Sequence, residues 1–65
     1  MNFGENLRSL RMTKNLKQAA LAEQLNVSAK TISHWENGYT EPSIAQLIML
    51  ARFFDVSIDD LVGNI

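Results

Sequence analysis

The sequence predicts a single all-α domain of five short helices. Two observations lead to this prediction: apolar residues recur at helical spacing in five separate segments, and these segments are bounded mostly by Ser, Asn or Gly residues that begin or end helices. No alternating run typical of a β-strand, internal repeat or linker interrupts the pattern. A chain of 65 residues buries only about 60 % of the surface that its unfolded form exposes, so we expect no deep pocket.

The composition excludes several classes of protein. The chain has no cysteine, which leaves no disulfide framework and no thiolate metal site, and its single histidine, His34, leaves no cluster for a transition metal. We therefore expect no metal and no other cofactor. No apolar run approaches the roughly 18 residues that span a bilayer, and the N-terminus lacks the basic-then-apolar order of a signal peptide. We expect a soluble, cytoplasmic protein with no membrane partner and no small-molecule ligand.

An enzyme is not expected. The sequence contains no Gly-rich phosphate loop, nucleophile elbow or metal-ligand spacing. Asp59 and Asp60 are adjacent, so their carboxylates diverge on a helix. The positive first turn of a helix explains them better than a role as an acid/base pair.

The first helix is expected to begin at a capping box, Asn2 to Glu5, in which Asn2 is the N-cap. It is expected to end at Asn15, since Asn tolerates the left-handed conformation that closes a helix. Its inner stripe is predicted to contain Phe3, Leu7, Leu10 and Arg11.

The second helix is the first half of a stretch, residues 17–38, whose two helical patterns are joined by a turn too tight for antiparallel packing. It is predicted to start at about Lys17 or Gln18 and to stop at Asn26, again a residue suited to positive φ. Its inward positions are Leu21, Ala22 and Leu25.

The third helix is predicted to begin after Ser28, a favourable N-cap, and to be closed by Gly38. Ile32 and Trp35 fall on its inner side. Its outer side carries Lys30, Ser33, His34 and Asn37. These side chains can donate to or accept from base edges and phosphates, whereas a face made only for solubility usually carries Glu and Lys. A merely solvated helix is the alternative interpretation.

Two more helices are expected after an exposed loop, residues 39–42. Ser43 and Gln46 form a capping box for the fourth helix, and Ser57 and Asp60 form a similar one for the fifth. The inner side of the fourth is predicted to contain Ile44, Leu47, Leu50, Ala51 and Phe54, with Asp55 at its end. The fifth is predicted to bury Ile58 and Leu61.

The charge is distributed unevenly along the chain. The total is −1, but residues 1–35 carry a net +3 and residues 36–65 a net −4. Screening beyond about 8–10 Å lets a protein present its positive end to a polyanion while the other end stays hidden. The near-neutral total therefore does not exclude a nucleic-acid partner.

Several short motifs cover nearly the whole chain: Leu7-Arg8-x-Leu10-Arg11, Leu16-x-Gln18-x-x-Leu21-Ala22, Val27-Ser28-x-x-x-Ile32-Ser33-x-Trp35-Glu36-Asn37-Gly38, Pro42-Ser43 and Val56-Ser57. In this order they resemble the lambda-repressor-like (Cro/repressor, or xenobiotic-response-element) family of helix-turn-helix DNA-binding proteins. The resemblance implies one domain over residues 1–65, a helix-turn-helix at 17–38, and a recognition helix at 29–37 that lies in the major groove. It implies a sequence-specific regulator of transcription that binds double-stranded DNA. Repression is the expected direction of control, and activation is the alternative.

The DNA contacts that the resemblance implies lie on and around the recognition helix. Candidates for base contacts are Ala29, Lys30, Ser33 and His34. A phosphate is the alternative for Lys30, and plain surface exposure is the alternative for His34. Candidates for phosphate contacts are Lys17, Gln18, Ser28, Thr31, Asn37, Tyr39 and Thr40. Gln18 lies at a helix N-terminus, where free N–H groups favour an anion, although an ordinary first-turn polar residue is the alternative.

Two positions depart from the family pattern. Lys17 stands where the family often has Ser or Thr as an N-cap, which weakens the second helix by about 1 kcal/mol while adding a cation near the expected DNA backbone. Asn26 stands where the family usually has Gly, a chemically tolerable change.

Arg11 and Glu36 both project from the inner sides of their helices, where unpaired charges would be costly. We expect them to form a structural ion pair. The resemblance implies the same pair, joining the first helix to the recognition helix.

Apolar residues beyond those needed for the core suggest self-association. Met49 and Phe53 are predicted to be surplus to the core and, with Val62 and Ile65, to form a dimer patch suited to a palindromic operator. Scattered surface residues without a role are the alternative. The main alternative function is a protein-interaction module, such as an antitoxin or partner-docking domain, since this fold also acts in that way.

Overall fold

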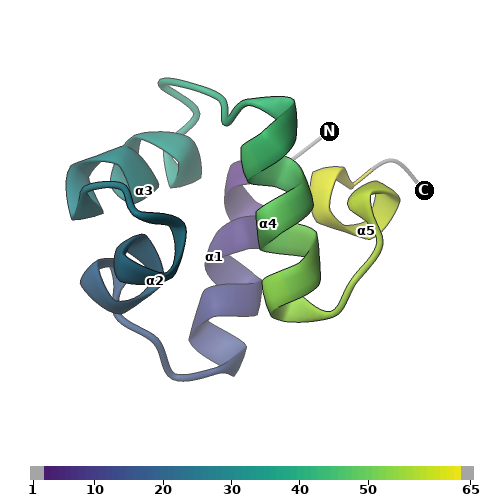
Figure 1. Ribbon diagram of the computed structural model, residues 1–65, viewed down its shortest axis with the longest axis horizontal. Coiled ribbons are helices and arrows are strands. Elements are labelled where there is room, and N and C mark those ends of the chain that lie inside the picture. The colour runs from purple at the N-terminus through teal and green to yellow at the C-terminus, as the bar shows by residue number, and fades with distance from the viewer. Residues whose placement is uncertain (1–2, 64–65) are drawn as a thin grey trace.

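The computed structural model describes residues 3–63 and contains five helices (Figure 1). They are α1 (Phe3–Thr13), α2 (Gln18–Leu25), α3 (Ala29–Glu36), α4 (Ile44–Phe54) and α5 (Ile58–Val62). Residues 3–63 contain no strand. The predicted five-helix, all-α fold is confirmed.

The helices are arranged around α1. In Figure 1, α2 and α3 lie together on one side and α5 lies on the other, with α4 across the centre of the view. Helix α1 contacts both α3 and α5, while α4 contacts α2 and α5. The first helix therefore links the α2–α3 pair to the C-terminal helix.

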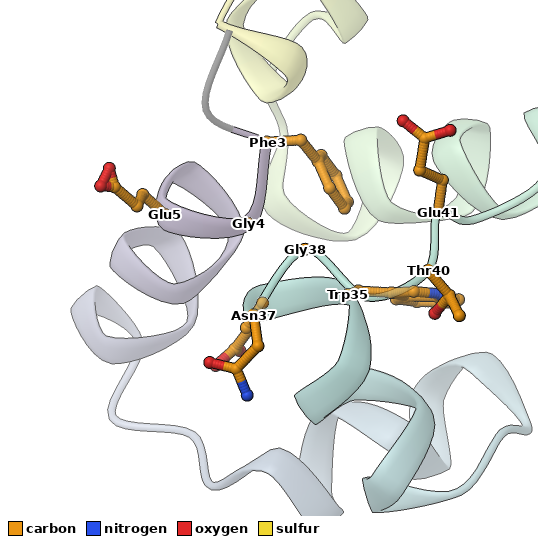
Figure 2. Close-up of a pocket in the computed structure, with 9 residues that line it drawn as sticks. Phe3, Gly4, Glu5, Trp35, Asn37, Gly38, Thr40 and Glu41 are labelled. Carbon is orange, nitrogen blue, oxygen red and sulfur yellow. The ribbon is translucent and has the colours of Figure 1, made fainter.

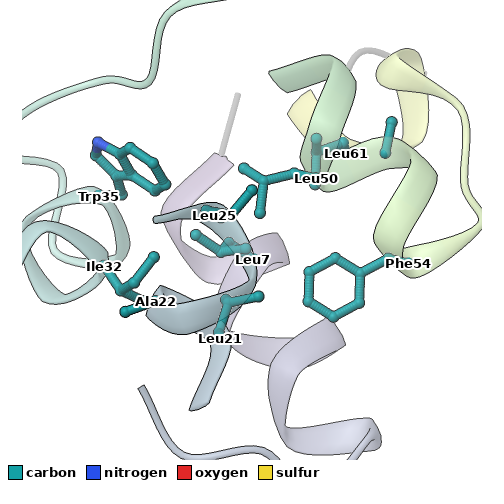
Figure 3. Close-up of a cluster of buried hydrophobic side chains, with 10 residues drawn as sticks. Leu7, Leu21, Ala22, Leu25, Ile32, Trp35, Leu50, Phe54 and Leu61 are labelled. Carbon is teal, nitrogen blue, oxygen red and sulfur yellow. The ribbon is translucent and has the colours of Figure 1, made fainter. Parts of the chain in front are cut away.

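The core is built from one fully buried residue of each helix: Leu7, Leu21, Ile32, Leu50 and Leu61. Ala22, Leu25, Trp35, Ala51 and Phe54 complete the buried cluster (Figure 3). Phe3, Leu10 and Leu47 pack against it from partly exposed positions. Because every helix contributes to the same cluster, the position of α3 depends on the packing of the whole chain.

The helix ends follow the sequence closely. Asn15, Asn26 and Asp55 adopt left-handed conformations with φ of 56°, 56° and 57°. The side chains of Ser28, Ser43 and Ser57 each accept a bond from the N–H three residues later. Around Ser43 the capping box is complete, because the Gln46 side chain accepts the Ser43 N–H at 2.8 Å. The Asn2 cap expected for the first helix lies outside the described residues.

The third helix ends one residue earlier than predicted. Helix α3 stops at Glu36, and Asn37 is its C-cap with φ −92° and ψ 0°. Gly38 follows with φ 79°, so the glycine does close the helix as expected.

Two residues predicted to be buried are exposed. The side chain of Ile44 is 76 % exposed and that of Ile58 is 40 % exposed. Each is the first residue of its helix, and its exposure shows that packing against the neighbouring helices is incomplete there. Apolar spacing alone does not show where the core ends along a helix.

The prediction that Phe53 is surplus to the core is wrong. Its ring packs against the buried cluster and meets Phe54 edge to face, with ring centroids 5.0 Å apart. The Lys14 ammonium lies 5.7 Å from the centroid of the Phe53 ring, so the residue that follows α1 partly covers this face.

None of the helices in residues 3–63 has both the length and the apolar character needed to cross a bilayer.

Candidate nucleic-acid interface

Helix α3 has one buried face and one accessible face. Ile32 and Trp35 are 0 % and 3 % exposed, while Lys30 is exposed. The remaining candidates for base contacts are partly exposed: Ala29, Ser33 and His34. The structure therefore brings the four predicted base-contact residues to the side of α3 that solvent reaches.

The start of α3 presents two hydroxyls. Ser28 Oγ accepts the Thr31 N–H at 3.1 Å, and the Ser28 and Thr31 hydroxyl oxygens are 3.0 Å apart. Both residues were predicted to contact phosphates. Only one hydroxyl hydrogen is needed for the bond between them, so the pair still has a hydrogen to donate to an anion.

At the start of α2, Lys17 is the N-cap residue, with φ −79° and ψ 159°. Its side chain makes no capping bond, so the first N–H groups of the helix have no side-chain acceptor. The Lys17 side chain is exposed. A cation and free N–H groups at one helix end together favour an anion.

Gln18 makes a contact within the protein that the sequence did not indicate. Its Nε2 donates to Glu36 Oε1 at 3.2 Å, which joins the first residue of α2 to the last residue of α3. One amide hydrogen and the amide oxygen are not used in this bond. No motif in the sequence indicated the contact, because the two residues are 18 positions apart.

The structure brings Arg11 and Glu36 together. Arg11 Nε donates to Glu36 Oε2 at 2.7 Å, and Nη2 donates to Oε1 at 3.2 Å. Arg11 Nη1 also donates to the Leu16 carbonyl at 2.7 Å. The side chains are only 12 % and 3 % exposed. One carboxylate therefore ties α1, α2 and the end of α3 into a fixed frame.

Gly4 is a second contact between α1 and α3 that the sequence did not reveal. A Cβ at this position would lie 2.4 Å from the Glu36 carbonyl oxygen and 2.8 Å from that of Trp35. The first turn of α1 thus reaches the backbone at the end of α3, and only glycine permits this approach. A glycine inside a helical pattern was the available signal.

A cavity of about 280 Å³ lies beside this junction, between the first turn of α1 and the loop after α3 (Figure 2). The residues that line it include three acidic ones, Glu5, Glu36 and Glu41, and no Lys or Arg. It is therefore unsuited to a phosphate. The face suited to an anion lies at the starts of α2 and α3 instead.

Comparison with known proteins shows which family the chain belongs to. The profile of a family described as "Helix-turn-helix" matches residues 7–61. The chain belongs to this helix-turn-helix family. The resemblance to Cro- and repressor-type proteins inferred from the motifs is confirmed.

Three relatives show the extent of the similarity. The HTH-type transcriptional activator BcrR of Enterococcus faecalis is 48 % identical over 64 residues, which are 98 % of this chain and 31 % of the relative. A transcriptional regulator from Listeria innocua has a TM-score of 0.93 at 44 % identity, covering 97 % of this chain and 59 % of that one. The P22 c2 repressor in complex with a synthetic operator has a TM-score of 0.91 at 34 % identity, covering 100 % and 98 %. The chain spans about a third of BcrR and about three fifths of the Listeria protein.

The remaining residues predicted to contact phosphates lie at and just after the end of α3. Asn37 Nδ2 donates to Ser33 Oγ at 3.3 Å, so these two neighbours on the outer face orient each other. Tyr39 and Thr40 follow in an exposed loop, and Tyr39 is 75 % exposed.

Of the predicted dimer patch, Met49 is 43 % exposed, Val62 is half-buried, and Ile65 lies outside the described residues.

Proposed function

We propose that this chain is the DNA-binding unit of a transcription regulator and that α3 enters the major groove of an operator. The observation that carries the proposal is the contrast within α3: its inner face is fixed by burial and by Glu36, while its polar outer face is left to solvent. The likeness to a repressor solved with its operator supports it. A cytoplasmic location is part of this proposal.

The proposal divides the contacts into two groups. The residues proposed to read bases are Ala29, Lys30, Ser33 and His34. The residues proposed to hold phosphates are Lys17, Gln18, Ser28, Thr31, Asn37, Tyr39 and Thr40. Phosphate contacts fix the register of the protein on the duplex, while base contacts carry the sequence information.

We propose repression as the direction of control. Occupying an operator that overlaps a promoter is sufficient to block transcription, whereas activation needs an additional contact with the transcription machinery. A reporter gene tests this directly. Its expression should fall when the chain is supplied and the operator overlaps the promoter, and a rise would reverse the assignment.

A homodimer on a palindromic operator is also part of the proposal, with half-sites about 34 Å apart. The exposed apolar residues of α4 are Ile44, Ile48 and Met49, so they replace Phe53 as the surface to examine. Sedimentation with and without operator should show two chains per palindrome. Monomer alone at high concentration, with DNA present, would contradict the dimer.

We propose no catalytic role. Asp59 and Asp60 occupy the first turn of α5, and the Asp60 N–H donates to Ser57 Oγ at 3.0 Å. Carboxylates at this end of a helix are explained by the helix dipole.

The experiment that tests the proposal begins with selection of bound oligonucleotides from a random pool. The affinity of the selected duplex should fall about 10³- to 10⁵-fold between 50 and 200 mM salt, as expected if a dimer neutralises about 6–10 phosphates. His34→Ala should relax the preference at one or two base pairs. Lys17→Ala should weaken binding to all duplexes alike and reduce the salt slope by about 1. A chain that enriches no sequence, and instead binds another polypeptide, would favour the protein-interaction function.

A further inference from the structure

The end of α3 has a specific backbone geometry. The Gly38 N–H donates to the Trp35 carbonyl at 3.3 Å, and the Tyr39 N–H donates to the His34 carbonyl at 2.9 Å. With Gly38 at φ 79°, this pair of bonds is a Schellman motif. A Cβ on Gly38 would meet nothing within 4 Å, so the positive φ, rather than crowding, is what favours glycine there.

The motif places the ring of Tyr39 against the ring of His34. Their centroids are 5.5 Å apart at an interplanar angle of 62°, an edge-to-face arrangement. A side-chain contact between the corresponding two positions commonly accompanies a Schellman motif. Tyr39 is nevertheless 75 % exposed, so it contributes little to the core. The ring contact with His34 is the feature of this side chain that needs an explanation.

A histidine on the outer face of a helix can adopt several staggered rotamers in the absence of a neighbour. Binding would then have to select one of them, at the expense of conformational entropy. A ring packed beside the imidazole restricts this choice before DNA arrives. It also limits which base edge the imidazole nitrogens can reach, because a hydrogen bond to a base requires the donor to point towards the acceptor.

We propose that Tyr39 is a positioning residue for His34 and sets the orientation in which the imidazole meets a base edge. This inference rests on the proposed function, and it assigns Tyr39 a part in sequence discrimination beyond a phosphate contact. Gly38 permits the turn, the turn places the Tyr39 ring, and the ring orients His34.

Two substitutions separate the ring of Tyr39 from its hydroxyl. Tyr39→Phe removes the only group that can bond a phosphate but keeps the ring against His34. Tyr39→Ala removes both. A positioning role therefore predicts that discrimination survives Tyr39→Phe and falls in Tyr39→Ala, while a phosphate contact alone predicts equal and uniform losses in both variants.

The decisive experiment measures the Kd of the full chain for its selected operator and for duplexes with single base-pair changes. The parent, Tyr39→Phe, Tyr39→Ala, His34→Ala and the double alanine variant are compared. Tyr39→Ala should reduce the preference by about 2- to 10-fold, at the same base pairs as His34→Ala, as expected from the strength of an edge-to-face pair. In the double variant the two losses should not add. Additive losses, or a loss spread evenly over all duplexes, would overturn the inference.

A measurement without DNA examines the contact itself. In the parent, NMR couplings of His34 should report one dominant χ1 rotamer, and Tyr39→Ala should shift the imidazole resonances and average the couplings. Unchanged couplings would show that Tyr39 does not restrict His34, even if the operator is bound well. If the parent prefers no duplex, the proposed function fails and the inference fails with it. If discrimination is intact in Tyr39→Ala, only the inference fails.

Discussion

The inner and outer faces of α3 are joined by the same backbone and serve different purposes. On the inner face Ile32 and Trp35 are buried, and the Glu36 carboxylate accepts bonds from Arg11 and Gln18. On the outer face, Lys30 is exposed, and the partly exposed His34 packs its ring only against that of Tyr39 among the rings of the described residues. We therefore expect inner substitutions to change the free energy of unfolding, and outer substitutions to change binding while leaving folding nearly unaltered.

The largest effect is expected from Glu36→Ala. It leaves the Arg11 guanidinium without its carboxylate in a place where the Arg11 side chain is only 12 % exposed. Removing one partner of a buried pair costs about 3–5 kcal/mol. Urea denaturation should show this loss as a lower midpoint with an unchanged m-value.

Two variants serve as controls for this prediction. Glu36→Gln keeps an oxygen that can accept a bond from Arg11, so its loss should be smaller. Lys30→Ala lies on the opposite face and should change stability by less than about 0.5 kcal/mol, while lowering affinity for DNA. An unchanged melting midpoint for Glu36→Ala would remove the structural role of the pair. A large loss for Lys30→Ala would break the distinction between the two faces.

The next effect is expected from Gly4→Ala. The new methyl group would lie 2.4 Å from the Glu36 carbonyl oxygen, so the first turn of α1 must move away from the end of α3. Overpacking of this kind typically costs about 1–3 kcal/mol, which exceeds the helix propensity gained by replacing Gly with Ala. Thermal unfolding should show a lower midpoint. The matched control, Ser9→Ala on the exposed side of α1, should unfold at or slightly above the parent temperature.

Gly4 also shows why part of the site could not be predicted from the sequence. The five helices, the Ser caps of α3, α4 and α5, and the ends at Asn26 and Gly38 each depend on residues within a few positions, and the sequence predicted them correctly. The contact of Gly4 with the Glu36 backbone joins residues 32 positions apart. The glycine itself signals a close approach, but the partner depends on how α1 crosses α3, which no local pattern encodes.

The dependence on contacts between helices also explains the wrong predictions for Ile44 and Phe53 on α4, and why the hydrogen bond from Gln18 to Glu36 was not predicted. Helical spacing placed Ile44 inward, but its exposure depends on whether another helix reaches the start of α4. Phe53 was placed outward, yet Lys14 and Phe54 cover part of its ring. Gln18 was expected only to contact DNA, and its bond to Glu36 arises because α2 and α3 meet at that point. Local chemistry was predictable, whereas a contact between helices was predictable only where two charges on inner faces had to pair, as in Arg11 and Glu36.

The smallest effect concerns the two N-caps that begin the helices of the helix-turn-helix. Ser28 caps α3 with its side chain, while Lys17 at the start of α2 forms no such bond although its backbone already has the extended conformation that a cap requires. Lys17→Ser should therefore stabilise the fold by about 0.5–1 kcal/mol, and Ser28→Ala should destabilise it by about 1 kcal/mol.

Lys17→Ser should at the same time weaken binding to every duplex and lower the salt slope by about 1, because a cation is lost beside the DNA backbone. Urea denaturation and affinity measurements on one preparation would show stability and binding moving in opposite directions. If both increased, the start of α2 would not hold a phosphate, and Lys17 would be an ordinary surface residue. Opposite changes would support a phosphate contact at the start of α2, where Lys17 supplies a cation in place of a side-chain cap.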